Sequence, residues 1–284
     1  MRTIIIDSNY IGHQARYSMP ELKYEEDATG VIFGFLSRIL TIGMKFKSND
    51  LFFVWDSKSS KRKEIFPEYK CNRKTKTPEE QREVEIAIKQ FVKLRKKILP
   101  ALGFNNVYLQ PGYEGDDLIA KFVLGRLGEF IIVTADEDLF QCLQANTKIY
   151  NPSKKKIMTR KRFKEEYGID SCHWFNVKAL AGCSSDGVPG LRGIGEKTAI
   201  KYLTKTLDKK SKAYQNIIQN GDGALRRNLP LVQLPFENTK DMKHEYNDFN
   251  IGAFRRLCVK YGMDSFMKKE KLKEWELFFE GVFE

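Results

Sequence analysis

Two acidic segments near the middle of the chain contain the residues most able to do chemistry. They read Glu-Gly-Asp-Asp at 114–117 and Asp-Glu-Asp at 136–138. Either segment alone is compatible with an acidic helix start or a polar turn. Together they predict bound divalent cations, because carboxylate oxygens are the preferred ligands of Mg²⁺ and Mn²⁺, and neither segment contains the histidine or cysteine that would favour zinc.

Predicted strands would bring further acids to the same place. Three apolar runs each end at or close to an aspartate, Asp7, Asp56 or Asp136, and each is followed by a pattern typical of an amphipathic helix. The carboxyl ends of parallel strands meet at one edge of a sheet. We therefore expect an α/β fold with a mostly parallel central sheet flanked by helices and with carboxylates along that edge. The three runs are residues 3–6, 51–55 and 130–133.

The charge of the chain is unevenly distributed. Residues 113–139 contain seven acidic and two basic residues, whereas the 284-residue chain has a formal net charge of +12 and a pI near 9.3. This contrast predicts cations at the acidic segment and a polyanion, most naturally a nucleic acid, on the basic remainder.

Neither a membrane span nor an oxidising compartment is indicated. The sequence contains no apolar run of about 18 residues, and its first residues lack the pattern of a signal peptide. Five cysteines lie far apart without paired spacing, which suits reduced thiols in a cytoplasm.

A strongly basic segment follows the second predicted strand. Residues 58–76 contain eight basic and two acidic residues, and Thr77-Pro78 then begins a predicted helix. The segment is either a solvated loop or an element that binds the phosphates of a substrate beside the metal site.

A glycine-rich run at 182–199 precedes another predicted helix, which begins near Glu196. Glu196 separates Gly195 from Lys197, so the run does not match a phosphate-binding P-loop, in which the lysine directly follows the glycine. Glycines at 190, 193 and 195 still allow backbone amides to approach a phosphate at a helix N-terminus. This predicts binding to the nucleic-acid backbone that does not depend on base sequence.

These features together resemble the 5′-nuclease superfamily, over roughly residues 3–260. The segment Tyr-Lys-Cys-Asn-Arg at 69–73 looks like the Tyr-Lys-x-x-Arg of the family's helical arch, and the two acidic segments look like its central acidic motifs. Residues 182–199 resemble the long Gly-Asp-x-x-Asp-Asn-x-Pro-Gly-x-x-Gly-Ile-Gly-x-Lys-Thr-Ala signature, which leads into a helix-three-turn-helix. The resemblance implies a PIN-like 5′-nuclease fold with a nuclease core at 1–180, an arch at about 57–98, and a duplex-binding and C-terminal helical region at 181–284.

The resemblance also implies specific roles. One Mg²⁺ would be held, directly or through water, by Asp7, Asp56, Glu114, Asp116 and Asp117, and a second would be held or shaped by Asp136, Asp138 and Asp186. Lys70, Arg73 and Arg62 would contact the scissile phosphate, and Gly193, Gly195 and Lys197 would grip the duplex backbone. A K⁺ ion is implied at the helix-three-turn-helix, and Mn²⁺ could replace Mg²⁺.

The implied activity is two-metal hydrolysis of DNA, by a monomer, at flaps, nicks and free 5′ ends. It includes 5′ to 3′ exonuclease or flap endonuclease action in replication and repair, with removal of RNA from RNA–DNA hybrids left open. The expected location is the cytoplasm of a bacterium or of a bacteriophage-infected cell.

One departure from the family pattern leaves an alternative open. Cys183 stands where the signature has its first aspartate. A thiol is a poor ligand for a hard cation, which predicts weaker binding of the second metal. A DNA-binding replication-accessory relative with weakened catalysis is therefore the rival interpretation. A small RNA-cleaving toxin of the PIN fold fits less well, because such proteins are shorter and lack the glycine-rich run.

Overall fold

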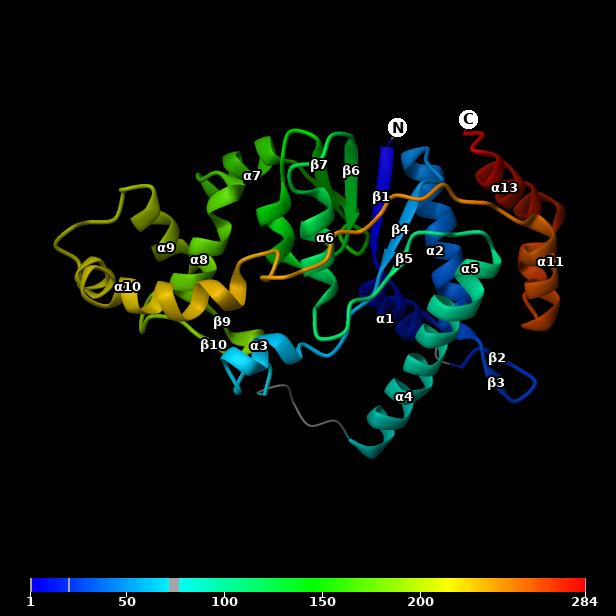
Figure 1. Ribbon diagram of the computed structural model, residues 1–284, viewed down its shortest axis with the longest axis horizontal. Coiled ribbons are helices and arrows are strands. Elements are labelled where there is room, and N and C mark those ends of the chain that lie inside the picture. Colours follow the sequence, from blue (N-terminus) through cyan, green and yellow to red (C-terminus); the bar gives the residue numbers. More distant parts are fainter. Residues whose placement is uncertain (1, 20, 72–76, 284) are drawn as a thin grey trace.

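The computed structural model describes residues 2–19, 21–71 and 77–283 (Figure 1). Its centre is a six-stranded sheet in the order β5-β4-β1-β6-β7-β8. All neighbouring strands are parallel except β8, which forms an antiparallel hairpin with β7 at the sheet edge. The predicted, mostly parallel sheet is therefore confirmed. The strands are β1 (Arg2–Asp7), β4 (Leu51–Val54), β5 (Val107–Tyr108), β6 (Glu129–Val133), β7 (Thr147–Asn151) and β8 (Lys156–Met158).

Both faces of the sheet are buried, which explains why its strands are continuous apolar runs. Along β1, Ile4 and Ile6 belong to one hydrophobic cluster and Ile5 to another. In β4, Phe53 belongs to the cluster of Ile4, and Phe52 belongs to the cluster of Ile5. Because successive side chains of a strand point to opposite faces, this alternation places helices on both sides of the sheet.

One layer of helices covers the face of Ile4. It contains α1 (Ser8–Ser18), α2 (Gly30–Phe46), α4 (Pro78–Lys93), the following π-helical turn η1 (Leu94–Ile98) and α5 (Leu99–Ala101). A small hairpin of β2 (Lys23–Tyr24) and β3 (Asp27–Ala28) connects α1 to α2. The other face is covered by α6 (Gly115–Val123), the 3-10 turn η2 (Glu137–Cys142), α7 (Arg160–Tyr167), the 3-10 turn η3 (Ser171–His173) and α8 (Trp174–Ala181).

The C-terminal third of the chain is split between the two ends of the molecule (Figure 1). At one end lie the two-stranded pair β9 (Gly182–Cys183) and β10 (Val188–Pro189), the 3-10 turn η4 (Ser184–Asp186), α9 (Glu196–Leu203) and α10 (Lys212–Val232). At the other end, α11 (Ile251–Lys260), α12 (Asp264–Met267) and α13 (Lys269–Glu280) add Phe254, Phe266 and Trp275 to the cluster under α2.

The predicted arch helix begins where its capping residues place it. Thr77 Oγ1 accepts a hydrogen bond from the Glu80 amide at 3.2 Å, and the Glu80 carboxylate accepts one from the Thr77 amide at 2.9 Å. This reciprocal capping box satisfies two amides at the start of α4. The short helix α3 (Ser60–Ile65) lies on the other side of residues 72–76. In the part of the chain that the structure describes, no helix is long and apolar enough to span a membrane.

Candidate active site

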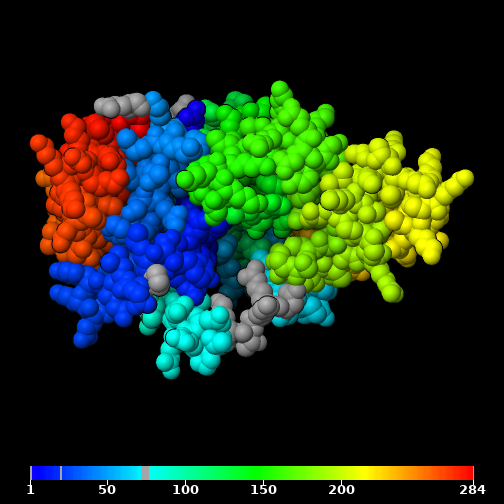
Figure 2. All heavy atoms as spheres, turned by 180° about the vertical axis from the view of Figure 1, so that it is seen from behind, coloured from blue at the N-terminus to red at the C-terminus, as the bar shows by residue number. Residues whose placement is uncertain are grey.

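An open cleft of about 870 Å³ lies at the carboxyl edge of the sheet. Figure 2 shows the surface hollowed here, between the N-terminal region in blue, the green region above it and the cyan arch below. The strand ends, the start of α6 and the arch all reach this cleft, so the predicted convergence of acids is observed. Its lining includes Asp7, Asp56, Glu114, Asp116, Asp136 and Lys70.

The two strand-end aspartates are held by hydrogen bonds from neighbouring elements. Asp7 caps α1 by accepting from the Tyr10 amide at 3.0 Å, and its other oxygen accepts from the Thr134 hydroxyl at 2.8 Å. Asp56 accepts from the Gly115 amide at 2.7 Å. A Cβ at Gly115 would lie 2.9 Å from that Asp56 oxygen, so glycine permits the close approach of α6 to the end of β4.

Three carboxylates that face the cleft, those of Asp7, Asp116 and Asp136, hold protons unusually strongly. Loss of hydration, followed by repulsion from Asp56, raises the pKa of Asp7 to about 7. Burial and then the charges of Asp136 and Asp7 raise the pKa of Asp116 well above its usual range. Loss of hydration and then repulsion from Asp138 raise the pKa of Asp136 to about 6. Like charges so close together favour a cation between them. Their oxygen donors therefore fit a hard divalent metal.

Asp117 and Arg62 lie beneath the cleft and bind each other. Asp117 is 0% exposed and Arg62 is 2% exposed. Two guanidinium nitrogens of Arg62 donate to the Asp117 carboxylate at 2.6 and 2.7 Å, and its Nε donates to the Leu231 carbonyl at 2.9 Å. Asp117 also accepts from the amides of Glu114 and Phe236.

These contacts bear on two residues that the resemblance assigns to the site. Asp117 does not line the metal cleft, and the guanidinium of Arg62 is directed at a buried carboxylate and a backbone carbonyl. The implied roles, a metal ligand directly or through water for Asp117 and a phosphate contact for Arg62, stay predictions. The bidentate pair of Arg62 and Asp117 joins α3 to the start of α6 and fixes the position of Glu114 and Asp116.

Lys70 and Tyr69 connect the arch to the acids. Lys70 Nζ forms an ion pair with Glu114 and lies 3.6 Å from the Asp186 carboxylate. The Tyr69 hydroxyl lies 3.1 Å from Glu114 Oε2 and 3.1 Å from Asp186 Oδ2. Because the nearby cations Lys70 and Arg62 outweigh the effect of burial, the pKa of Glu114 is lowered. Arg73, the other expected phosphate contact, lies outside the described residues.

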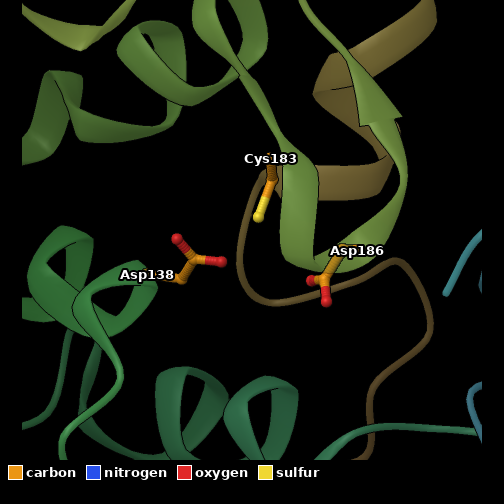
Figure 3. Close-up of side chains that lie close together, drawn as sticks. All are labelled: Asp138, Cys183 and Asp186. Carbon is orange, nitrogen blue, oxygen red and sulfur yellow. The ribbon is translucent and has the colours of Figure 1, made fainter. Parts of the chain in front are cut away.

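A second group of ligands lies beside the first. One oxygen each of Asp138 and Asp186 and the sulfur of Cys183 lie within 4.8 Å of one another, and the three side chains point toward a common space (Figure 3). Burial and then the charge of Asp138 raise the pKa of Cys183. The Lys178 ammonium lies 3.2 Å from Asp138 and 2.9 Å from Glu196 at the start of α9.

The expected DNA-contacting residues lie on the surface at the far end of the molecule from α13 (Figure 1). Gly193 has a φ of 77°, in the left-handed region that favours glycine, and a Cβ added at Gly193 or Gly195 would meet nothing within 4 Å. Ile194 between them is buried in the core. The loop is thus anchored by one side chain while its backbone, Gly195 as the cap of α9, and Lys197 stay exposed.

Three residues of the site were not identified from the sequence. The side-chain oxygen of Asn9 accepts a hydrogen bond from the Asp56 amide at 3.0 Å. The Tyr69 hydroxyl contacts both Glu114 and Asp186. The ammonium of Lys178 balances the negative charge of Asp138. Only Tyr69 carried a signal, because it stands in the Tyr-Lys-x-x-Arg segment. The other two act on partners distant in sequence.

Comparison with known proteins agrees with this architecture. Residues 2–168 match the family model of the 5′-3′ exonuclease, N-terminal resolvase-like domain. The chain is 30% identical to the 5′-3′ exonuclease of Buchnera aphidicola, over 88% of this chain and 82% of the relative. It is 28% identical to the 5′-3′ exonuclease of Aquifex aeolicus, over 98% and 93%.

Two further comparisons concern polymerases and solved structures. DNA polymerase I of Deinococcus radiodurans is 31% identical over 72% of this chain, but the match spans only 21% of that polymerase. The T5 D15 protein co-crystallized with metal ions superposes with a TM-score of 0.71 at 21% identity, over 83% of this chain and 90% of that one. The structural likeness supports the fold, and the sequence matches show that the chain belongs to the 5′-3′ exonuclease family of the 5′-nuclease superfamily.

Proposed function

We propose that this protein is a structure-specific 5′-nuclease that hydrolyses phosphodiester bonds of DNA at 5′ ends and flaps. The observation that carries the proposal is the meeting of five carboxylates and Lys70 in one open cleft at the sheet edge. Divalent cations at such a site supply Lewis-acid activation of water and neutralise charge on the leaving oxygen. Relatives named 5′-3′ exonuclease support this activity.

The position of each residue in the cleft indicates its proposed role in metal binding or in orienting the phosphate. Asp7, Asp56, Glu114, Asp116 and Asp136 line the cleft and are the candidate metal ligands, while Asp138 and Asp186 would serve a second ion. Mg²⁺ is the proposed metal, with Mn²⁺ able to replace it. Lys70, which now pairs with Glu114, would orient the scissile phosphate together with Arg73.

Duplex DNA is the proposed partner away from the cut. Gly193, Gly195 and Lys197 would bind its backbone without reading bases, and K⁺ at the helix-three-turn-helix remains part of the proposal. Solved neighbours support DNA as the ligand, because they include a T5 flap endonuclease in complex with DNA and metal ions and the catalytic core of Rad2 with a DNA substrate.

The proposal extends to the oligomeric state, further substrates, domain division and location of the protein. We propose action as a monomer, with RNA–DNA hybrids as further substrates, and a division between a nuclease core at 1–180 and a duplex-binding and C-terminal region at 181–284. A cytoplasmic location in a bacterium or phage-infected cell is supported by the bacterial relatives and by five free cysteines.

Cleavage of labelled DNA tests the proposal directly. A 5′-labelled flap duplex and a matching blunt duplex are incubated with Mg²⁺, with Mn²⁺ and with chelator. Released flaps or short 5′ fragments that depend on metal are expected, and Asp116→Asn should lower their rate of release about 10³-fold. Asp241→Asn is the matched control, because Asp241 is an exposed acid paired with Arg126 outside the cleft.

A second function, DNA binding without catalysis, is favoured by one observation. Cys183 occupies a ligand position in the second group and removes a carboxylate from it. Tight flap binding with no product under either metal would establish this reading and reject the nuclease.

A further inference from the structure

A second, smaller groove opens directly beside the metal cleft. Its volume is about 320 Å³, within the range of roughly 300–1,000 Å³ common for small-molecule pockets. It shares Asn9, Asp56, Ser57 and Lys58 with the larger cleft. A group that enters this groove therefore stays close to the strand-end carboxylates.

The rest of the lining is mainly apolar. Ile88 and Val92, four residues apart on α4, are 48% and 41% exposed, and Phe91 lies buried between them. Positions i and i+4 share one face of a helix, so the two aliphatic side chains form a continuous exposed strip over the groove. Such a strip next to charged residues marks a binding surface better than isolated apolar residues do.

Trp55 belongs to the lining of the groove but is largely covered by its neighbours. The side chain is 2% exposed, lies parallel to Phe35 with ring centroids 5.7 Å apart, and is 5.7 Å from Phe91. Its indole nitrogen is buried and has no hydrogen-bond partner among the described residues. The indole nitrogens of Trp174 and Trp275 are in the same state, so this buried donor does not by itself indicate a ligand.

The charges at the rim indicate what kind of ligand fits. Lys58 and Arg95 line the groove, and Asp56 stands on the side of the metal cleft. Apolar walls for a flat ring and basic groups for its phosphates match a nucleotide of a single strand.

We propose that this groove, which we call the Trp55 groove, receives the unpaired base of the flap nucleotide next to the scissile phosphate. The proposal rests on the proposed nuclease function and names the part of the substrate that the site recognises. An unpaired base reaches the groove without breaking a base pair. Its insertion would hold the neighbouring phosphate at the carboxylates.

Binding measurements with Ca²⁺ in place of Mg²⁺ test the groove. The probe is a flap duplex with 2-aminopurine as the first flap base, and the matched probe has an abasic site there. Ile88→Asn should weaken binding of the first probe about tenfold, because the base loses an apolar contact with the wall of the groove. It should leave the abasic probe as tightly bound as by the parent protein.

The control variant lies on the same helix. Ile86 is 45% exposed but does not line the groove, so Ile86→Asn should change neither affinity by more than about twofold. An equal loss for both probes, an equal loss for both variants, or no loss with Ile88→Asn would each overturn the proposal. Thermal unfolding of each variant separates loss of binding from loss of fold.

Failure of the groove and failure of the nuclease give different results. If the parent protein cleaves the flap and Ile88→Asn binds both probes normally, the groove is rejected and the nuclease stands. If binding depends on the base but the parent protein cleaves nothing in Mg²⁺ or Mn²⁺, the groove stands and the nuclease is rejected.

Discussion

The two groups of metal-ligand candidates differ in how their charge is balanced. In the main cleft, Asp7, Asp116 and Asp136 face one another, and the pKa of each is raised. In the second group, Lys178 lies 3.2 Å from Asp138, and Cys183 contributes a thiol where the family signature has a carboxylate. Loss of hydration still raises the pKa of Asp186 there. The first group needs a cation to hold its charges together, whereas the protein already balances part of the charge of the second. We therefore expect the main cleft to bind metal more tightly and to dominate catalysis.

The largest expected effect follows from removing a ligand of the main cleft. Asp116→Asn should lower the rate of flap cleavage by about 10³-fold, since electrostatic stabilisation at a reacting phosphate contributes on this scale. Cys183→Ala should change the rate by less than about threefold, because a thiol contributes little to a hard-metal site. Single-turnover cleavage compares them, and losses of similar size would remove the distinction between the two groups.

The next effect concerns the buried pair beneath the cleft. Arg62→Ala should destabilise the protein by about 3–5 kcal/mol, because it leaves the Asp117 carboxylate buried without its partner. Lys61→Ala is the control, since its pair with Glu64 is exposed and worth less than about 1 kcal/mol. Denaturant unfolding measures both changes. Normal stability with lost cleavage in Arg62→Ala would favour the phosphate-contact role predicted from the sequence.

Substituting the cations of the arch should lower the cleavage rate, whereas substituting the lysine that follows the glycine-rich loop should lower the affinity for duplex DNA. The double change Lys70→Ala, Arg73→Ala should reduce the cleavage rate about 10²-fold with little change in duplex affinity. Lys197→Ala should do the reverse, weakening duplex binding and lowering its salt dependence by about one counterion. Equal losses of rate and affinity in the double variant would exclude its catalytic assignment.

These two regions also show how far the sequence can be interpreted. The strand-end positions of Asp7 and Asp56 follow from apolar runs that stop at an acid, and the structure confirms both. The difference between Asp116 and Asp117 could not be predicted. Consecutive helical residues project about 100° apart, and which of them faces the cleft depends on Arg62, 55 residues earlier in the chain. Pairings of this kind depend on tertiary contacts.

The raised pKa values of the main cleft predict a dependence of stability on pH. Without metal, folded Asp7 keeps its proton up to about pH 7, whereas an ordinary aspartate loses it near 3.8. The folded state therefore binds more protons in this window, and the contribution of Asp7 to stability falls as pH rises through it. The melting temperature with chelator should fall less steeply between pH 4 and 7 for Asp7→Asn than for the parent protein. Identical slopes would mean that Asp7 does not titrate in the folded protein as its surroundings imply.

The smallest effect comes from making the second group resemble the first. Cys183→Asp should lower the Mg²⁺ concentration needed for half-maximal cleavage by about threefold to tenfold, because metal affinity rises with the number of charged ligands. The gain should be modest because Lys178 still neutralises Asp138. Cys172→Asp controls for added charge, since Cys172 is exposed and outside the second group. An unchanged Mg²⁺ titration would show that the side chain at 183 does not reach the second ion, and the weaker charge of this group would then have no bearing on metal binding.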